Sequence, residues 1–392
     1  VGSHGNMGRG GLGRVNLDYA ANGIGVECDT LKDVYLYDGG PLLIRRDSPV
    51  VYSFTSSTFQ GTFASDVSFK PVLVPGKSPA SLSTVKYDGF YSGVMVSEDS
   101  TVALERTYYA PKGGGDSSDF VIICSKFYSY DGLAHNNLLI GDLIDWDLPA
   151  DVGADNKTGI EGSTVFIRGT DTGATAACPA RPNKTRFAAN TFLGMHTRAE
   201  KLANACANDV GRYGQYAGRN DSDVFTADNG VLDPAKTWTK AGALSGAAAL
   251  APSLDSTDVH IVTTYKYNYN LAGNDTVTVY TALTTELDGT SADLKANFTA
   301  ACNWYNNNLR PGCTVCSCCI GSTGNADGSL DDVVDIGDLT ALIDNLFITL
   351  APLLCTAEGD IASPPDAVVD IGDLTALIDH LFINLTPTAP CQ

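Results

Sequence analysis

Oxygen-bearing side chains recur at short intervals near the C-terminal end of the sequence. They begin at Asn325 and end at Asp338, where a run of apolar residues starts. Alternating oxygen ligands that converge on one point suit a hard cation such as calcium. Zinc and copper favour His or Cys ligands, and this stretch contains neither. The calcium ligands predicted for this first loop are Asn325, Asp327, Ser329, Asp331, Asp335 and Asp338.

A second, poorer loop lies further along the chain. Ala362 and Pro364 stand where the first loop has Asp327 and Ser329, so this loop offers fewer oxygens. In the first loop Asp335 and Asp338 could instead serve only to cap the N-terminus of the following helix. The ligands predicted for the second loop are Asp360, Asp366, Asp370 and Asp373.

Both loops must be positioned by a duplicated apolar segment. Residues 333–348 recur almost unchanged as residues 368–383. Their apolar side chains fall at helical spacing, so each copy is predicted to form a one-sided amphipathic helix. Neither helix can bury its stripe alone, and the two are expected to pack on each other. The predicted stripes are Ile336, Leu339, Leu342, Ile343, Leu346 and Phe347, and Ile371, Leu374, Leu377, Ile378, Leu381 and Phe382.

Charge is distributed unevenly along the 392 residues, which carry 45 acidic and 25 basic side chains. Residues 320–392 hold 11 Asp and one Glu without any Lys or Arg, a local charge of −12. Such a segment either stays disordered through self-repulsion or binds cations, and its apolar content favours binding. The acidic balance argues against a nucleic-acid partner. No apolar run reaches the roughly 18 residues of a transmembrane helix.

The duplicated loop and helix, with Asp335 and Asp338 followed by Leu-Thr-x-Leu-Ile-Asp, resembles a type I dockerin module over about Ile320 to Leu385. The resemblance implies a secreted, calcium-dependent docking module built from two half EF-hands. Dockerins contact their cohesin partner through the two residues just before the closing Asp. The resemblance therefore implies partner contacts here, although isoleucine at this place could equally belong to the core. The matching positions are Ile336, Gly337, Ile371 and Gly372.

The 11 cysteines agree with an exported protein. Cys313-Thr-Val-Cys316 could be half of a zinc or redox site, but no second pair lies nearby. Disulfides that staple a small helical module are the favoured interpretation, and the odd number leaves one thiol free or linking two chains. The predicted pairs are Cys178 with Cys206, and Cys318 or Cys319 with Cys355 and Cys391.

The first 305 residues are predicted to form a β-sandwich with long loops and a terminal helix. Segments rich in Val, Ile, Thr and Tyr alternate with turn residues. A helix is predicted after Ser291 and another near Arg198 to Val210, whereas the Gly- and Ala-rich residues 171–254 are expected to form loops. Residues 306–319 would be a Cys-rich linker before an all-α module at 320–392. The predicted strands include Val34–Tyr37, Val50–Thr55, Val102–Tyr109, Phe120–Tyr128, Leu138–Leu148, Thr164–Arg168, Val259–Tyr269 and Thr276–Thr285.

One acidic cluster in this β-domain could do chemistry. On a strand, Asp145 and Asp147 would share a face, with Trp146 on the other. Two carboxylates beside an aromatic ring suit a glycosidase, in which one acts as acid and the other as base or nucleophile. A calcium site, a carbohydrate-binding site or turn-forming aspartates would use the same residues.

Two classes of function follow from these patterns. In the first, the protein is a secreted, calcium-binding structural subunit of an extracellular filament, surface layer or complex. Its partners would be other protein subunits, through homo-assembly or a cohesin-like receptor. In the second, it is a secreted glycoside hydrolase or carbohydrate-binding protein that acts on glycans and carries a dockerin for attachment. The lack of an assembled catalytic motif in the sequence favours the first class.

Overall fold

The structure is a computed structural model, and it describes only part of the chain. The N-terminal described residues are 7–8, 36–46, 51–54, 69–72, 80–83, 87–111, 120–146, 148, 156–161, 164–170 and 185–202. The remaining ones are 214–219, 234–235, 237–238, 259–286, 291–310, 323–327, 333–350, 353, 355–364, 366 and 368–389.

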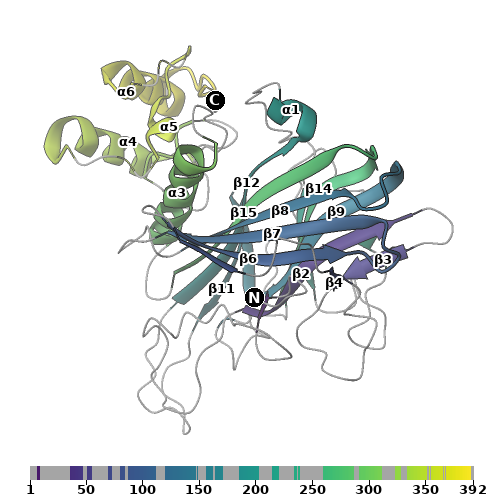
Figure 1. Cartoon of the computed structure of the whole chain (residues 1–392). Coiled ribbons are helices and arrows are strands. Elements are labelled where there is room, and N and C mark those ends of the chain that lie inside the picture. Colours follow the sequence, from purple (N-terminus) through teal and green to yellow (C-terminus); the bar gives the residue numbers. More distant parts are fainter. Residues whose placement is uncertain are drawn as a thin grey trace, which may run out of the picture.

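Two antiparallel sheets dominate the fold, so the predicted mainly-β class is confirmed (Figure 1). The smaller sheet has six strands in the order β1-β2-β9-β14-β13, with β3 paired to β2. Its strands are β1 (Met7–Gly8), β2 (Leu36–Arg45), β3 (Val51–Phe54), β9 (His135–Trp146), β13 (Gly214–Arg219) and β14 (Val259–Leu271).

The larger sheet has nine strands in the order β10-β11-β12-β15-β8-β7-β6-β4, with β5 paired to β6. Long strands with β-branched and aromatic residues form its centre, because such residues favour β-structure. Its strands are β4 (Lys70–Val72), β5 (Ala80–Ser83), β6 (Tyr87–Val96), β7 (Val102–Pro111), β8 (Phe120–Ser129), β10 (Lys157–Glu161), β11 (Thr164–Thr170), β12 (Thr185–Thr197) and β15 (Thr276–Glu286).

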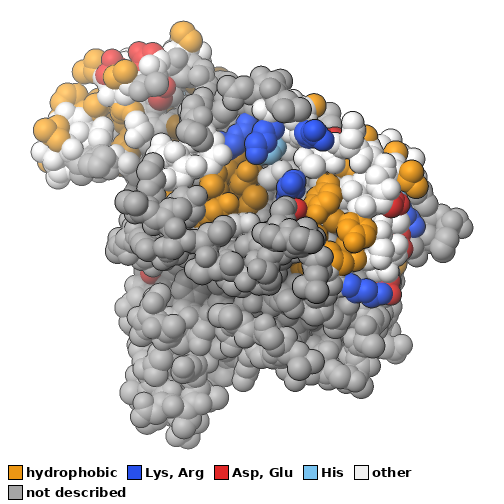
Figure 2. All heavy atoms as spheres, viewed as in Figure 1, with side chains coloured by type: hydrophobic (Ala, Val, Ile, Leu, Met, Phe, Trp, Pro, Cys, Tyr) orange, Lys and Arg blue, Asp and Glu red, His pale blue; other side chains and the backbone are white. Residues whose placement is uncertain are grey.

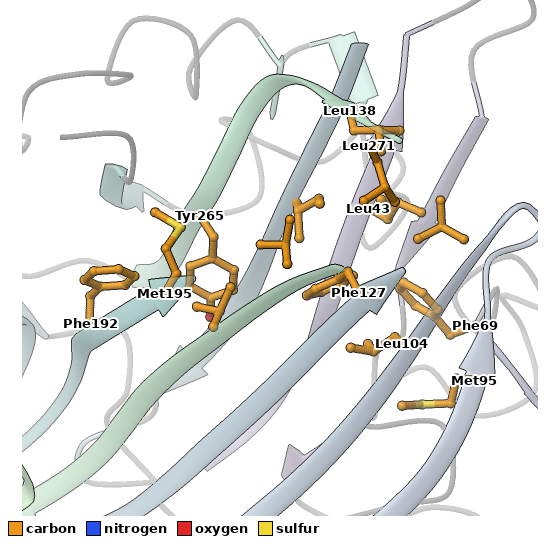
Figure 3. Close-up of a cluster of buried hydrophobic side chains, with 14 residues drawn as sticks. Leu43, Phe69, Met95, Leu104, Phe127, Leu138, Phe192, Met195, Tyr265 and Leu271 are labelled. Carbon is orange, nitrogen blue, oxygen red and sulfur yellow. The ribbon is translucent and has the colours of Figure 1, made fainter. Parts of the chain in front are cut away.

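The main hydrophobic core lies between the two sheets (Figure 3). Leu43, Leu138 and Tyr265 reach it from the six-stranded sheet, and Leu104 and Phe127 from the nine-stranded sheet. All five are at least 97% buried. Because both sheets contribute apolar faces to one core, the two layers fit the predicted sandwich.

A buried ion pair links the sheets within this apolar layer. The Arg106 guanidinium on β7 donates a short hydrogen bond to the Asp142 carboxylate on β9. Tyr265 on β14 donates its hydroxyl to the same carboxylate, and Arg106 Nε donates to Ser125 Oγ at 3.0 Å. Burial alone would lower the pKa of Arg106, but the charge of Asp142, together with the effects of Tyr108 and Tyr265, outweighs burial and raises that pKa. The guanidinium is therefore held charged inside the protein.

Part of the outer face of the nine-stranded sheet is covered by α3 (Ser291–Asn308). Leu294, Phe298, Ala301 and Tyr305 lie one helical turn apart or nearly so, and all are buried. The helix predicted after Ser291 is thus confirmed. The second predicted helix is described only as the short α1 (Arg198–Leu202), and its remainder lies outside the described residues.

The stretch 171–254, which is expected to be a loop-rich insertion, contains two strands that the sequence did not predict. β12 occupies the middle of the nine-stranded sheet, and β13 lies at an edge of the six-stranded one. From Arg186 to His196 every residue of β12 is buried, because a core lies on each face of this sheet. A strand buried on both faces has no polar alternation to reveal it.

At the end of β12, His196 makes stability depend on pH. Burial, together with the charges of Arg310 and Lys201, lowers the pKa of His196 to about 4. In the unfolded chain the His196 imidazole binds a proton below pH ~6.5, whereas in the folded chain it does so only below pH ~4. Acidification between these values therefore lowers the free energy of unfolding. Between pH 7 and 4.5, we expect the free energy of unfolding of the His196→Gln variant to fall by about 2–3 kcal/mol less than that of the unsubstituted protein. Urea unfolding at both pH values measures this difference, and equal losses would contradict it.

The C-terminal module (residues 320–392) contains a pair of matching helices. α4 (Ile336–Ile343) continues into a π-helical turn, η7 (Asp344–Ile348), and α6 (Ile371–Ile378) continues into η8 (Asp379–Ile383). A short helix, α5 (Thr356–Gly359), lies between them. The pair packs through one apolar cluster centred on Leu342, Leu374 and Leu377. No helix in the described part of the chain is long and apolar enough to cross a membrane.

The two ends of this module meet. The Thr323 backbone N–H and hydroxyl both donate to the Ala389 carbonyl, at 2.8 and 3.0 Å. The Ala389 N–H in turn donates to the Ile361 carbonyl at 3.4 Å. These bonds hold the entry and the exit of the helix pair side by side.

Candidate functional site

The predicted acidic residues lie where each helix of the C-terminal module begins. Asp335 and Asp370 are the residues before the first helical turn, and each accepts a 2.6 Å hydrogen bond from a glycine N–H two residues on. Asp338 and Asp373 reach back to the N–H groups of Asp335 and Asp370, at 2.7 and 2.8 Å. Both helices therefore start with a complete capping box, which is the alternative role that the sequence left open for Asp335 and Asp338.

The closing aspartates also bind the loops that precede the helices. Asp338 accepts a 3.0 Å hydrogen bond from the Asp327 N–H, and Asp373 accepts from the N–H groups of Ile361 and Ala362 at 2.7 and 2.8 Å. Both carboxylates are almost completely buried. Burial and the charges of Asp327 and Asp335 raise the pKa of Asp338, against the opposing effect of its two backbone donors.

A glycine allows the carboxylates of the first loop to approach one another. A Cβ atom on Gly337 would lie 2.7 Å from Asp327 Oδ2 and 3.0 Å from Asp335 Oδ1. Oxygens from two parts of the loop thus lie within 3.0 Å of one point. At Gly372 the equivalent position is approached only by Asp370 Oδ1, at 2.9 Å. The first loop therefore concentrates more negative charge than the second.

The other predicted ligands are placed less closely together. Asn325 is buried, Asp360 accepts from the Asp366 N–H at 3.3 Å, and Asp366 accepts from the Val368 N–H at 2.9 Å. Ser329 and Asp331 lie outside the described residues. Within the part of the chain that is described, no three His, Cys, Asp or Glu side chains form a group that could hold a metal. The oxygen-only donors of the first loop fit calcium in type.

The helix pair exposes apolar side chains that the stripe pattern assigns to its core. Ile336 and Ile371 are each 63% exposed, and Phe347 and Phe382 are 57% and 58% exposed. The predicted stripes are therefore wrong at these four positions. The residues implied as partner contacts, Ile336 and Ile371 with the neighbouring Gly337 and Gly372, all lie in the first turn of α4 or α6.

The acidic cluster of the β-domain is only partly described. Asp145 pairs in the six-stranded sheet with Asp38 on β2 and with His260 on β14, while Asp147 lies outside the described residues. Trp146 between them is fully buried, and its Nε1 donates to Asn190 Oδ1 at 2.9 Å. This hydrogen bond gives Trp146 a structural role in joining the two sheets.

Sequence patterns missed the buried ion pair between the sheets, Arg106 with Asp142, and its neighbour Tyr265. Asp142 lies in the sequence within the apolar run Leu138–Ile144 of β9, and a carboxylate there indicates a buried partner. The strand pattern does not identify that partner. Because this pair is enclosed between the sheets, it serves the fold rather than an exposed site.

Among the described cysteines, Cys124 is a free thiol on β8. Burial raises its pKa to about 12, so it is not a reactive thiolate. Cys355, at the start of α5, is buried. The other predicted disulfide partners, Cys178, Cys206, Cys318, Cys319 and Cys391, lie outside the described residues.

Comparisons with known proteins leave the family of this chain open. No protein-family model and no curated protein matches the sequence. Among solved structures, the α-galactosidase from Lactobacillus brevis is similar to 61% of this chain at 11% sequence identity, with a TM-score of 0.25. The match spans only 28% of that enzyme's own length. A TM-score this low carries no argument about fold or activity.

Proposed function

We propose that this protein is a secreted, calcium-binding assembly subunit whose dockerin-like C-terminal module docks onto another protein subunit. One observation carries the proposal. Of the twelve large hydrophobic side chains exposed among the described residues, ten lie in this module. They form five matched pairs, because each recurs 35 residues later in the repeat: Val333 and Val368, Ile336 and Ile371, Phe347 and Phe382, Ile348 and Ile383, Leu350 and Leu385.

Exposed apolar side chains of this density favour a docking role. Contiguous apolar surface is costly to leave in water and commonly marks a binding site. The backbone supports the same reading, since Leu350 and Leu385 adopt the left-handed region at φ of 56° and 53°. A leucine in this conformation is strained, and such strain concentrates at functional positions. Both copies keep the same strained turn beside their exposed side chains.

Calcium is the cation that the first loop would hold. Its donors are oxygens alone, and Asp327 and Asp335 already approach one point beside Gly337. A divalent ion there would offset the mutual repulsion of these carboxylates in a segment with no Lys or Arg. Export is supported by the cysteines, since Cys302 and Cys355 are both buried and both take the disulfide-bonded form.

Calorimetry tests the calcium part of the proposal. Calcium chloride is titrated into the full-length protein after treatment with EDTA. We expect saturable heat of binding that Asp327→Ala removes, because this substitution deletes a predicted ligand without altering the capping side chains. Asp131→Ala is the matched control, since Asp131 lies in the turn between β8 and β9. Absence of heat with the unsubstituted protein would overturn the calcium assignment.

A further inference from the structure

The C-terminal module requires a partner that supplies positive charge. With −12 over residues 320–392 and no Lys or Arg, two such modules repel each other. Their exposed apolar side chains are therefore poorly suited to bind a second module. A suitable surface combines Lys or Arg with apolar side chains, so that charge guides the approach and apolar burial stabilises the contact.

The outer face of the nine-stranded sheet offers such a surface beside α1. We define this basic face as Lys126 on β8, Arg198 and Lys201 on α1, and Arg310 after α3. Arg198 and Lys201 are exposed, and Lys126 and Arg310 are half-buried. Figure 2 shows Lys and Arg side chains gathered in this region next to hydrophobic ones.

These basic side chains act on common neighbours. In addition to burial, Lys201 and Lys126 influence the pKa of Cys124, and Arg310 and Lys201 influence the pKa of His196. The acidic side chains that act on the same two groups are Glu105 and Glu200. Three basic side chains thus act on these two groups beside two acidic ones. Arg198 lies next to one further carboxylate, Asp275, which accepts a 3.2 Å hydrogen bond from the Arg198 N–H, so four basic side chains stand against three acidic ones and the region carries net positive charge.

Aromatic side chains provide the apolar part of this surface. Lys126 Nζ lies 5.3 Å from the centre of the Tyr128 ring, and the rings of Tyr109 and Trp304 are 5.9 Å apart. All three aromatic side chains are half-buried. Basic and aromatic residues together are enriched at protein interfaces, whereas the module that they would receive is acidic and exposes apolar side chains.

The charge complementarity points to a second copy of this chain: we infer that the C-terminal module of one molecule docks on the basic face of the next. This inference rests on the docking role proposed above and names its partner. The contact joins two different surfaces, so it is head-to-tail, and repetition of such a contact builds an open chain of molecules unless it closes into a ring.

A mixing experiment with full-length variants tests the head-to-tail contact. The first variant, Phe347→Ser with Phe382→Ser, alters only exposed side chains of the module. The second, Lys126→Glu with Lys201→Glu, reverses charge on the basic face. In sedimentation velocity with calcium chloride, we expect the unsubstituted protein to form large oligomers and each variant to be monomeric. An equimolar mixture should give 1:1 dimers, because one intact module meets one intact basic face.

A matched control separates local from general charge effects. Lys70→Glu with Arg168→Glu makes the same change in net charge at two exposed positions on β4 and β11, toward the edges of the same sheet. We expect this control to assemble as the unsubstituted protein does, and circular dichroism to show all variants folded. Assembly that weakens at least tenfold in the Lys126 and Lys201 variant alone supports the inference.

Other outcomes would overturn it. Undiminished assembly of the Lys126 and Lys201 variant would indicate contact between modules instead. Monomers at every concentration, despite calcium binding in calorimetry, would mean that the module docks on its own chain or on a different protein. In that case the proposed docking role would be kept, but the inference that the partner is a second copy of this chain would be wrong. If calcium does not bind either, the proposed function fails together with the inference.

Discussion

Replacing Asp142 by Ala is expected to lower the free energy of unfolding by about 3–5 kcal/mol. Arg106 and Asp142 are both almost completely buried, and Tyr265 donates to the same carboxylate. Without the carboxylate, the Arg106 charge is left in an apolar layer among neutral partners that include Ser125 and Tyr108. The cost arises from this unpaired charge more than from the lost attraction itself. Urea denaturation followed by tryptophan fluorescence measures the effect.

A double substitution provides the control. Arg106→Met with Asp142→Leu removes both charges and keeps similar side-chain volumes, so no charge is left unpaired. We expect this double variant to be more stable than Asp142→Ala, as happens when whole buried ion pairs are replaced by apolar residues. A double variant less stable than the single one would show that the pair contributes net stability, and would contradict this account.

Replacing Asp338 by Ala is expected to destabilise the start of α4 by about 2–4 kcal/mol. This carboxylate accepts hydrogen bonds from the N–H groups of Asp327 and Asp335, and both donors lose their partner. Amide hydrogen exchange of α4 in the full-length protein measures the free energy of this local opening. The amides of α3 serve as an internal reference, because that helix packs on the sheet instead.

The same variant separates capping from calcium binding. In EDTA the loss reports the two hydrogen bonds alone. In calcium chloride it should be larger, because the predicted calcium ligand is removed as well. Asp373→Ala in the second copy should show a smaller difference between the two media, since its loop has fewer oxygens. Equal losses in both media would make Asp338 a helix cap and nothing more.

Much of the β-structure could be predicted from alternation and composition. β7 and β8 start at the predicted residues, Val102 and Phe120. They could be predicted because one face of each strand is only partly covered and keeps polar residues, so apolar and polar residues alternate in the sequence. β12 could not be predicted in this way. It contains Ala, Asn and Gly at positions where cores press on both faces, and its polar residues are buried with the rest. Small side chains are present there because the two cores leave little space beside the strand. In the sequence, a segment rich in such small residues resembles a loop.

The positions of the two helices in the candidate site could be predicted from the sequence, but the side chains that these helices expose could not. Helical periodicity identifies both helices and the buried Leu342 and Leu377. It assigns too many residues to the core, because a stripe of six apolar side chains is wider than the contact that a single helix neighbour covers. Ile336 and Phe347 fall at the edges of this stripe and remain in water. The Arg106–Asp142 pair depends on how two sheets face each other, which no local pattern specifies.

The bonding of Thr323 to Ala389 has a consequence for engineering. Because residues 323–389 enter and leave at the same place, they could replace a surface loop of an unrelated host without stretching its backbone. Such a chimera would carry the module as an attachment point in place of a dispensable host loop. The orientation of the module would be set by the two host strands or helices that flank it instead of by one flexible tether.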